Sequence, residues 1–142
     1  MGVGLLLVNL NKKMFSQLLA YNDIGLFLLR LAVAVIFIYH SLPKLKNSKM
    51  MAQGMGMSAG FVLLLGLVEF FSGAALILGV YTNVASALLA LVMVGAIYFK
   101  TTKWKVPFSA MDKTGWEFDF ILLAANLAIF FVGAGSIALL KY

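Results

Sequence analysis

Four long apolar segments dominate this sequence, and each approaches the length that an α-helix needs to cross a lipid bilayer. They cover residues 24–42, 59–81, 84–99 and 118–140. A membrane-spanning helix needs about 17–25 mostly apolar residues, and polar flanking residues extend the short third segment. The runs are continuous and rich in leucine and alanine, whereas barrel strands alternate in polarity. The sequence predicts an all-α fold, with residues 1–142 forming one integral membrane domain, a four-helix transmembrane bundle.

The composition supports a membrane protein and excludes several kinds of chemistry. Hydrophobic residues make up 63% of the 142 residues and charged residues 11%, whereas about a quarter of the residues in soluble domains are charged. There is no cysteine, which excludes disulfides, thiolate metal sites and iron–sulfur clusters. A single histidine excludes a haem held by two histidines of one chain. We therefore expect no metal site and no cofactor held permanently by this chain.

The basic residues predict the orientation in the membrane. The net charge is +6, and the lysines lie in the connections between apolar segments, which favours the lipid bilayer over nucleic acid as a partner. Cytoplasmic loops carry an excess of Lys and Arg, so we expect loops one and three in the cytoplasm and both termini outside. Loops one and three carry Lys44, Lys46, Lys49, Lys100, Lys103, Lys105 and Lys113, against Lys12, Lys13 and Lys141 on the opposite side.

Two ionisable residues lie within the apolar segments. Arg30 lies in the first segment and Glu69 near the middle of the second, which runs in the opposite direction. An ionised side chain in hydrocarbon is usually paired or faces water. When the middles of the two segments are aligned, the two residues differ in depth by about one helical turn. We therefore predict an Arg30–Glu69 ion pair, with snorkelling of Arg30 to the membrane surface as the alternative.

A polar cluster is predicted where the first segment ends and the fourth begins, because both ends lie on the same side of the membrane. One interpretation is a set of helix caps and interfacial anchors. The other is a site for a quinone head group or an anion, since a histidine beside carboxylates exchanges protons near neutral pH. The residues are His40, Ser41, Lys44, Trp116, Glu117 and Asp119.

The first loop contains four methionines within Met50–Met57. Thioether sulfur binds Cu(I), so a copper site is one interpretation. An adaptable apolar loop on the membrane surface is the commoner use of methionine. The sequence does not decide between them.

Three motifs, in this order and spacing, resemble the DoxX family of small four-helix integral membrane proteins. They are "HSLPK" at the exit of the first segment, "EFFSGAALILGVYT" in the second, and "GWEFD" at the start of the fourth. His40, Lys44, Glu69, Trp116 and Glu117 match the family's motifs, whereas Ser41 stands where the family usually has glycine. The resemblance implies a link to respiratory or sulfur oxidoreduction, because relatives are described as membrane subunits of thiosulfate:quinone oxidoreductase and as partners of detoxifying enzymes.

Three functions follow as hypotheses. The first is a quinone-facing membrane subunit of an oxidoreductase complex, with a quinone near the polar cluster and electrons supplied by a soluble or membrane partner. The second is a non-catalytic scaffold or assembly partner of another membrane protein. The third is a small transporter or channel, which four spans without an inverted repeat could form only as a homo-oligomer. Whether the chain is itself an enzyme is left open.

Overall fold

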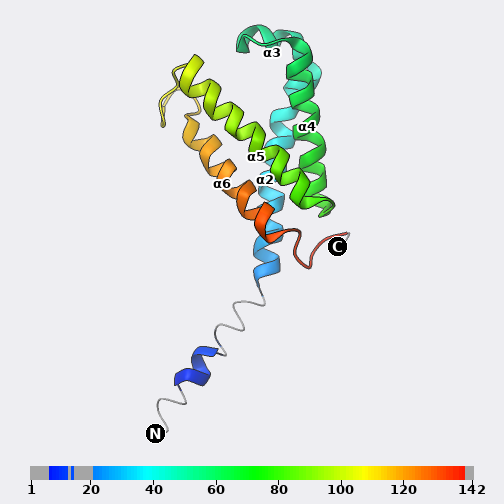
Figure 1. Cartoon of the computed structure of the whole chain (residues 1–142), viewed down its shortest axis with the longest axis vertical. Coiled ribbons are helices and arrows are strands. Elements are labelled where there is room, and N and C mark those ends of the chain that lie inside the picture. The colour runs from blue at the N-terminus through cyan, green and yellow to red at the C-terminus, as the bar shows by residue number, and fades with distance from the viewer. Residues whose placement is uncertain (1–6, 13, 15–20, 140–142) are drawn as a thin grey trace.

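The computed structural model describes residues 7–12, 14 and 21–139, and the regular structure in this part of the chain is helical (Figure 1). This confirms the all-α prediction. The elements are α2 (Asn22–Lys46), α3 (Ser48–Met55), α4 (Ala59–Leu78), α5 (Thr82–Tyr98), the π-helix η1 (Phe99–Lys103) and α6 (Trp116–Val132).

Three helical segments are long and apolar enough to cross a membrane, by length and composition. They are Asn22–Lys46, Ala59–Leu78 and Thr82–Lys103. A helix satisfies its own backbone hydrogen bonds, which is what hydrocarbon requires of a spanning segment. The fourth apolar helix, α6, has 17 residues. The protein is a helical membrane protein with three candidate spans and one further apolar helix.

The predicted fourth segment, residues 118–140, is wrong at its C-terminal end. The helix ends at Val132, because Gly133 and Gly135 adopt positive φ angles of 83° and 70°, a conformation that ends helices and suits glycine. Residues 133–139, which we call the C-terminal segment, are not helical. The backbone N–H of Leu139 donates to the carbonyl of Leu78 at 2.9 Å, which attaches this segment to the end of α4.

The first helix is longer than predicted. It continues through Pro43 to Lys46 instead of ending at residue 42. A proline so near the C-terminus of a helix removes one backbone hydrogen bond and leaves the following turn intact. The N–H of Asn47 donates to the carbonyl of Pro43 at 2.9 Å and closes the last turn.

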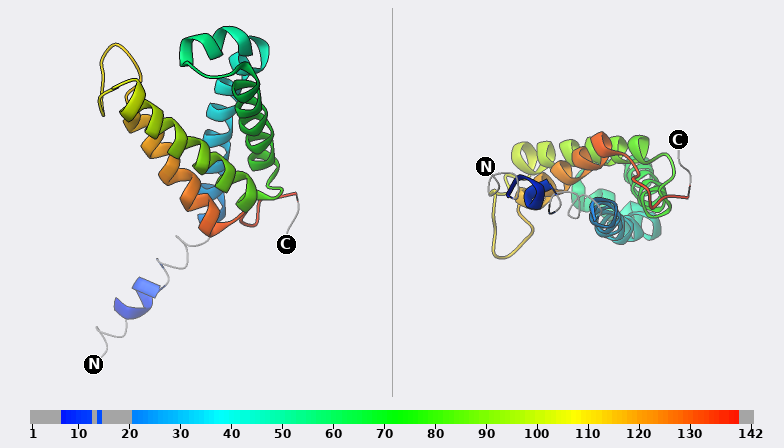
Figure 2. Two further views of the ribbon diagram at one scale, coloured as in Figure 1. Left: turned by 45° about the horizontal axis from the view of Figure 1, so that its top comes forward. Right: turned by 90° about the horizontal axis from the view of Figure 1, so that it is seen from below.

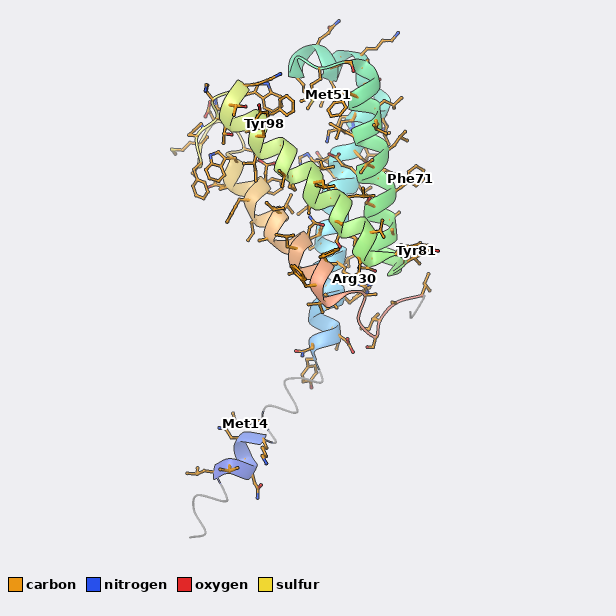
Figure 3. The ribbon with its side chains drawn as sticks, viewed as in Figure 1. Met14, Arg30, Met51, Phe71, Tyr81 and Tyr98 are labelled. Carbon is orange, nitrogen blue, oxygen red and sulfur yellow. The ribbon has the colours of Figure 1, made fainter. Side chains whose placement is uncertain are left out.

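The helices form two pairs, α2 with α4 and α5 with α6, each with its two helices side by side (Figures 1 and 2). The pairs meet near the α4–α5 turn and diverge toward the opposite end of the molecule (Figure 1). We call the end with the α4–α5 turn and the C-terminal segment the turn end. The end with α3 and residues 104–115 is the loop end. Figure 3 places Arg30 and Tyr81 at the turn end, and Met51 and Tyr98 at the loop end.

Glycines let α2 and α4 pack closely. A Cβ on Gly73 would lie 2.8 Å from a side-chain carbon of Ile38 and 3.2 Å from the backbone oxygen of Ala34. A Cβ on Gly66 would lie 3.0 Å from the Cβ of Lys44. Small residues at helix contacts allow this approach in membranes, where packing replaces the hydrophobic effect as the attraction between helices.

A shared core joins the two helix pairs. It contains nine buried apolar side chains from α2, α4, α5 and α6: Val33, Ala34, Phe37, Leu76, Ala85, Leu89, Met93, Leu122 and Ile129. Asn83 on α5 also donates to the carbonyl of Phe130 on α6 at 2.6 Å. The core and this hydrogen bond therefore hold the four helices together.

Candidate functional site

An ion pair between α2 and α4 forms one wall of the site. The Nζ of Lys44 donates to both carboxylate oxygens of Glu69, at 2.7 and 2.5 Å. The Glu69 side chain is only 3% exposed and the Lys44 side chain 13%. A buried carboxylate requires a close cationic partner, and Lys44 is that partner. The predicted Arg30–Glu69 ion pair is therefore wrong.

The register of α2 against α4 explains this correction. Aligning the middles of the first two apolar segments brings Arg30 within about one helical turn of the level of Glu69. In the structure, Nη1 of Arg30 lies 2.6 Å from the position that a Cβ would take on Gly79. Gly79 follows Glu69 by ten residues, which is about 15 Å along a helix. An arginine side chain at that level does not reach Glu69.

Arg30 is fully buried at the turn end (Figure 3), which also excludes the snorkelling alternative. Its Nη2 donates to the carbonyl of Ile137 in the C-terminal segment, and its guanidinium lies 5.7 Å from the centre of the Phe27 ring. Gly79, the C-cap of α4, lies against it, so the partial negative charge at the carboxyl end of α4 faces the cation. Arg30 thus ties α2, α4 and the C-terminal segment together.

A second ion pair joins the other two helices at the loop end. The Nζ of Lys100, in η1, lies 2.6 Å from a carboxylate oxygen of Asp119, in the first turn of α6. Their side chains are 17% and 8% exposed. The same ammonium also donates to the carbonyls of Thr114 and Gly115, at 3.3 and 3.4 Å. Lys100 thereby fixes the start of α6 to the end of the α5–η1 helix.

His40 lies between the two ion pairs. Its ring centre is 6.0 Å from that of Phe118 on α6, and it interacts electrostatically with Lys44, Lys100 and Asp119. His40, Lys44 and Asp119 also line one cavity, which agrees with their predicted proximity.

Three other members of the predicted polar cluster do not reach the same space. The hydroxyl of Ser41 is buried and donates to the carbonyl of Ile38, within its own helix, at 2.6 Å. Trp116 packs against Phe108, with ring centres 4.5 Å apart. Glu117 accepts a hydrogen bond of 3.0 Å from the hydroxyl of Ser109. Trp116 and Glu117 organise the loop that precedes α6.

A cavity of about 490 Å³ lies between the two helix pairs, and we call it the loop-end cavity. Both ion pairs and His40 line it, and the rest of its wall is almost entirely apolar. Met55 and Met57, in the first loop, also contribute, whereas Met50 is 65% exposed and does not. The aromatic side chains in the wall are Phe37, Phe61, Phe99, Trp104 and Phe118.

Lys100 is not among the predicted site residues, and Glu69 was predicted to pair with Arg30 instead of lining this cavity. Lys100 closes the third apolar segment beside the start of the fourth. A signal for this pair was present in the sequence. When two antiparallel helices are neighbours, a lysine at the end of the first lies close to an aspartate in the first turn of the second. Within the described ranges, no group of three or more His, Cys, Asp or Glu side chains is placed to hold a metal ion.

Two comparisons with known proteins found matches to this chain. A Bacillus subtilis (strain 168) protein named "Putative oxidoreductase CatD" is 29% identical over 120 residues, which cover 82% of this chain and 85% of that protein. No solved structure matches the chain. The DoxX family profile matches residues 25–102, more than half of the chain. This helical membrane protein therefore belongs to the DoxX family.

Proposed function

We propose that this protein is the quinone-binding membrane subunit of an oxidoreductase complex and that the quinone ring occupies the loop-end cavity. The observation that carries the proposal is an apolar cavity whose wall contains two lysine–carboxylate pairs and one histidine. Cavities of about 300–1,000 Å³ with apolar walls and a few convergent polar groups are typical of small-molecule sites. The volume of about 490 Å³ falls in this range.

The residues in the wall suit a quinone. Phe118 and Trp104 offer flat apolar surfaces for an aromatic ring. The ammonium groups of Lys44 and Lys100 can donate hydrogen bonds to ring carbonyl oxygens, and His40 offers a further donor or a proton acceptor. A quinone takes up two electrons and two protons when it is reduced. In this proposal the chain's own residues bind and orient the ring and exchange its protons.

The electrons come from a partner in this proposal. The chain has no cysteine and one histidine, so it lacks the ligands for an iron–sulfur cluster or a haem held by two histidines. The Bacillus relative carries the name of an oxidoreductase, which supports a role in electron transfer. A soluble or membrane-bound oxidoreductase docked at the loop end would lie next to the cavity.

The proposed orientation places that partner on the cytoplasmic side. With α6 as a fourth crossing, the loop end carries seven lysines, and the side with both termini carries three. The excess of lysine marks the cytoplasmic side. The loop-end cavity then lies near the inner surface of the membrane.

Binding in a lipid environment tests the proposal. The protein in nanodiscs is titrated calorimetrically with a short-chain ubiquinone or menaquinone analogue. We expect saturable binding with one site per chain, weakened about tenfold in His40→Ala because a charged or polar hydrogen bond is lost. Glu117→Gln is the matched control and should bind like the wild type, since Glu117 faces Ser109. Absence of saturable binding to the folded wild-type protein ends the proposal.

A second candidate function is a non-catalytic membrane scaffold. The observation that favours it is structural: each ion pair joins the two helices of one pair, and buried Arg30 attaches the C-terminal segment. These contacts would then serve only to hold a surface for another membrane protein. Co-purification of a stoichiometric partner, together with no quinone binding by either the chain or the complex, would favour this function over the first.

A further inference from the structure

The two ion pairs of the loop-end cavity stand on different halves of the fold. Lys44 and Glu69 belong to the α2–α4 pair. Lys100 and Asp119 belong to the α5–α6 pair, through η1. No ion pair between these two halves is present in the described part of the chain. The cavity therefore separates two walls, each with its own internally neutralised pair of charges.

Each wall offers the same chemistry. A lysine ammonium supplies hydrogen-bond donors and the carboxylate beside it supplies acceptors. Because each ammonium is neutralised by a carboxylate 2.5–2.6 Å away, the two walls together carry no net charge. Such a site does not favour an anion. It suits a neutral molecule with polar atoms at two opposite edges.

His40 shows that the two walls face one shared space. It lies on α2 with Lys44, yet its ring packs against Phe118 of α6. It also interacts electrostatically with Lys44 on one wall and with Lys100 and Asp119 on the other. A ring placed beside His40 would have one wall at each edge.

We propose that both ion pairs are specificity-determining parts of one site, and that the ligand bridges them through two oxygen atoms on opposite edges of its ring. Each carbonyl of a 1,4-dione accepts from one lysine, and each hydroxyl of the reduced 1,4-diol donates to one carboxylate. Either redox state of the ring is therefore bound by the same two walls. This inference rests on the proposed quinone site and adds the requirement that both ion pairs bind one ligand at the same time, at opposite edges of its ring.

The experiment compares a ligand with two carbonyls at opposite ring edges and a ligand with one. The protein in nanodiscs is titrated calorimetrically with 1,4-naphthoquinone and with 1-tetralone, which has the same fused carbon skeleton, one carbonyl and a saturated opposite edge. The wild type should bind the dione about tenfold more tightly, because the second wall gains a charged hydrogen-bond donor. Equal affinity for the two ligands overturns the bridging proposal and leaves the quinone site standing. Binding of neither ligand overturns the quinone site itself.

Two double variants test the walls separately. Lys44→Met/Glu69→Leu and Lys100→Met/Asp119→Leu each remove a complete ion pair, so that no buried charge is left without a partner. Each double variant should abolish the preference, so that 1,4-naphthoquinone and 1-tetralone bind with about equal affinity. Thermal unfolding identifies variants that retain the fold. If a folded double variant keeps the full tenfold preference, the wall that it removes does not bind the ligand.

Discussion

Lys44 and Glu69 form an ion pair across the α2–α4 contact, with Nζ 2.5 Å from a carboxylate oxygen. The contact is possible because Gly66, one helical turn before Glu69, lets the backbone of α4 approach the Cβ of Lys44. Both residues also line the loop-end cavity. The pair therefore stabilises the helix contact and supplies one polar wall of the proposed site.

Removal of one partner of this pair should destabilise the fold strongly. In Lys44→Met, the Glu69 carboxylate remains buried without its cation, and we expect the free energy of unfolding to fall by about 3 kcal/mol. Equilibrium unfolding in mixed detergent micelles measures the change. In the double variant Lys44→Met/Glu69→Leu, no charge remains, so the loss should be smaller than in Lys44→Met. A double variant that is less stable than either single variant would contradict this explanation.

Gly73 should tolerate no side chain. A Cβ there would lie 2.8 Å from Ile38, so Gly73→Ala should push α2 and α4 apart and lower the free energy of unfolding by about 1–3 kcal/mol. Gly60→Ala is the control on the same helix, because nothing lies within 4 Å of its Cβ position. Alanine favours the helix, so Gly60→Ala should be neutral or stabilising. Equal effects of the two substitutions would argue against the close α2–α4 packing.

Arg30 should hold the C-terminal segment in place. In Arg30→Met, the hydrogen bond to the carbonyl of Ile137 is lost, and amide hydrogen exchange in residues 133–139 should accelerate at least severalfold. Mass spectrometry of the exchanged protein measures this effect. Lys46→Met removes a positive charge from an exposed position of the same helix and should leave exchange in this segment unchanged. Unchanged exchange in Arg30→Met would contradict the assigned role.

The absence of native cysteine makes the orientation directly testable. Met111→Cys places a thiol at a fully exposed position in the loop before α6, and Asn11→Cys places one near the N-terminus. A membrane-impermeant maleimide should label Asn11→Cys in intact cells and Met111→Cys only after lysis. The reverse pattern would place the loop end outside.

The positions of the helices could be predicted from the sequence because hydropathy is a local property. The second segment begins at Ala59 as predicted and ends within three residues of the prediction. The fourth was predicted too long, since Ala, Ile and Leu after Val132 remain apolar and hydropathy does not register the positive φ of Gly133. Apolar composition sets how much chain lies in lipid, whereas backbone conformation sets where the helix ends.

The partner of Glu69 could not be predicted in this way, because it depends on the register between two helices. Aligning the middles of two segments ignores that α2 continues past Pro43 and that glycines set its contact with α4. An error in the register of α2 against α4 therefore puts Arg30 near Glu69, where the structure has Lys44. His40, Lys44 and Asp119 line one cavity, and their proximity could be predicted because each lies near a helix end, where the loops limit the register.

The most direct test of the proposed function locates the ligand itself. A photoreactive azidoquinone is crosslinked to the protein in nanodiscs, and the labelled peptides are mapped by mass spectrometry. We expect labelling of the peptides that contain Met55–Met57 and Phe118, which line the loop-end cavity, with competition by unmodified quinone. Labelling confined to the lipid-facing surface around Phe71, which is 64% exposed, and insensitive to competition would contradict a quinone site in this cavity.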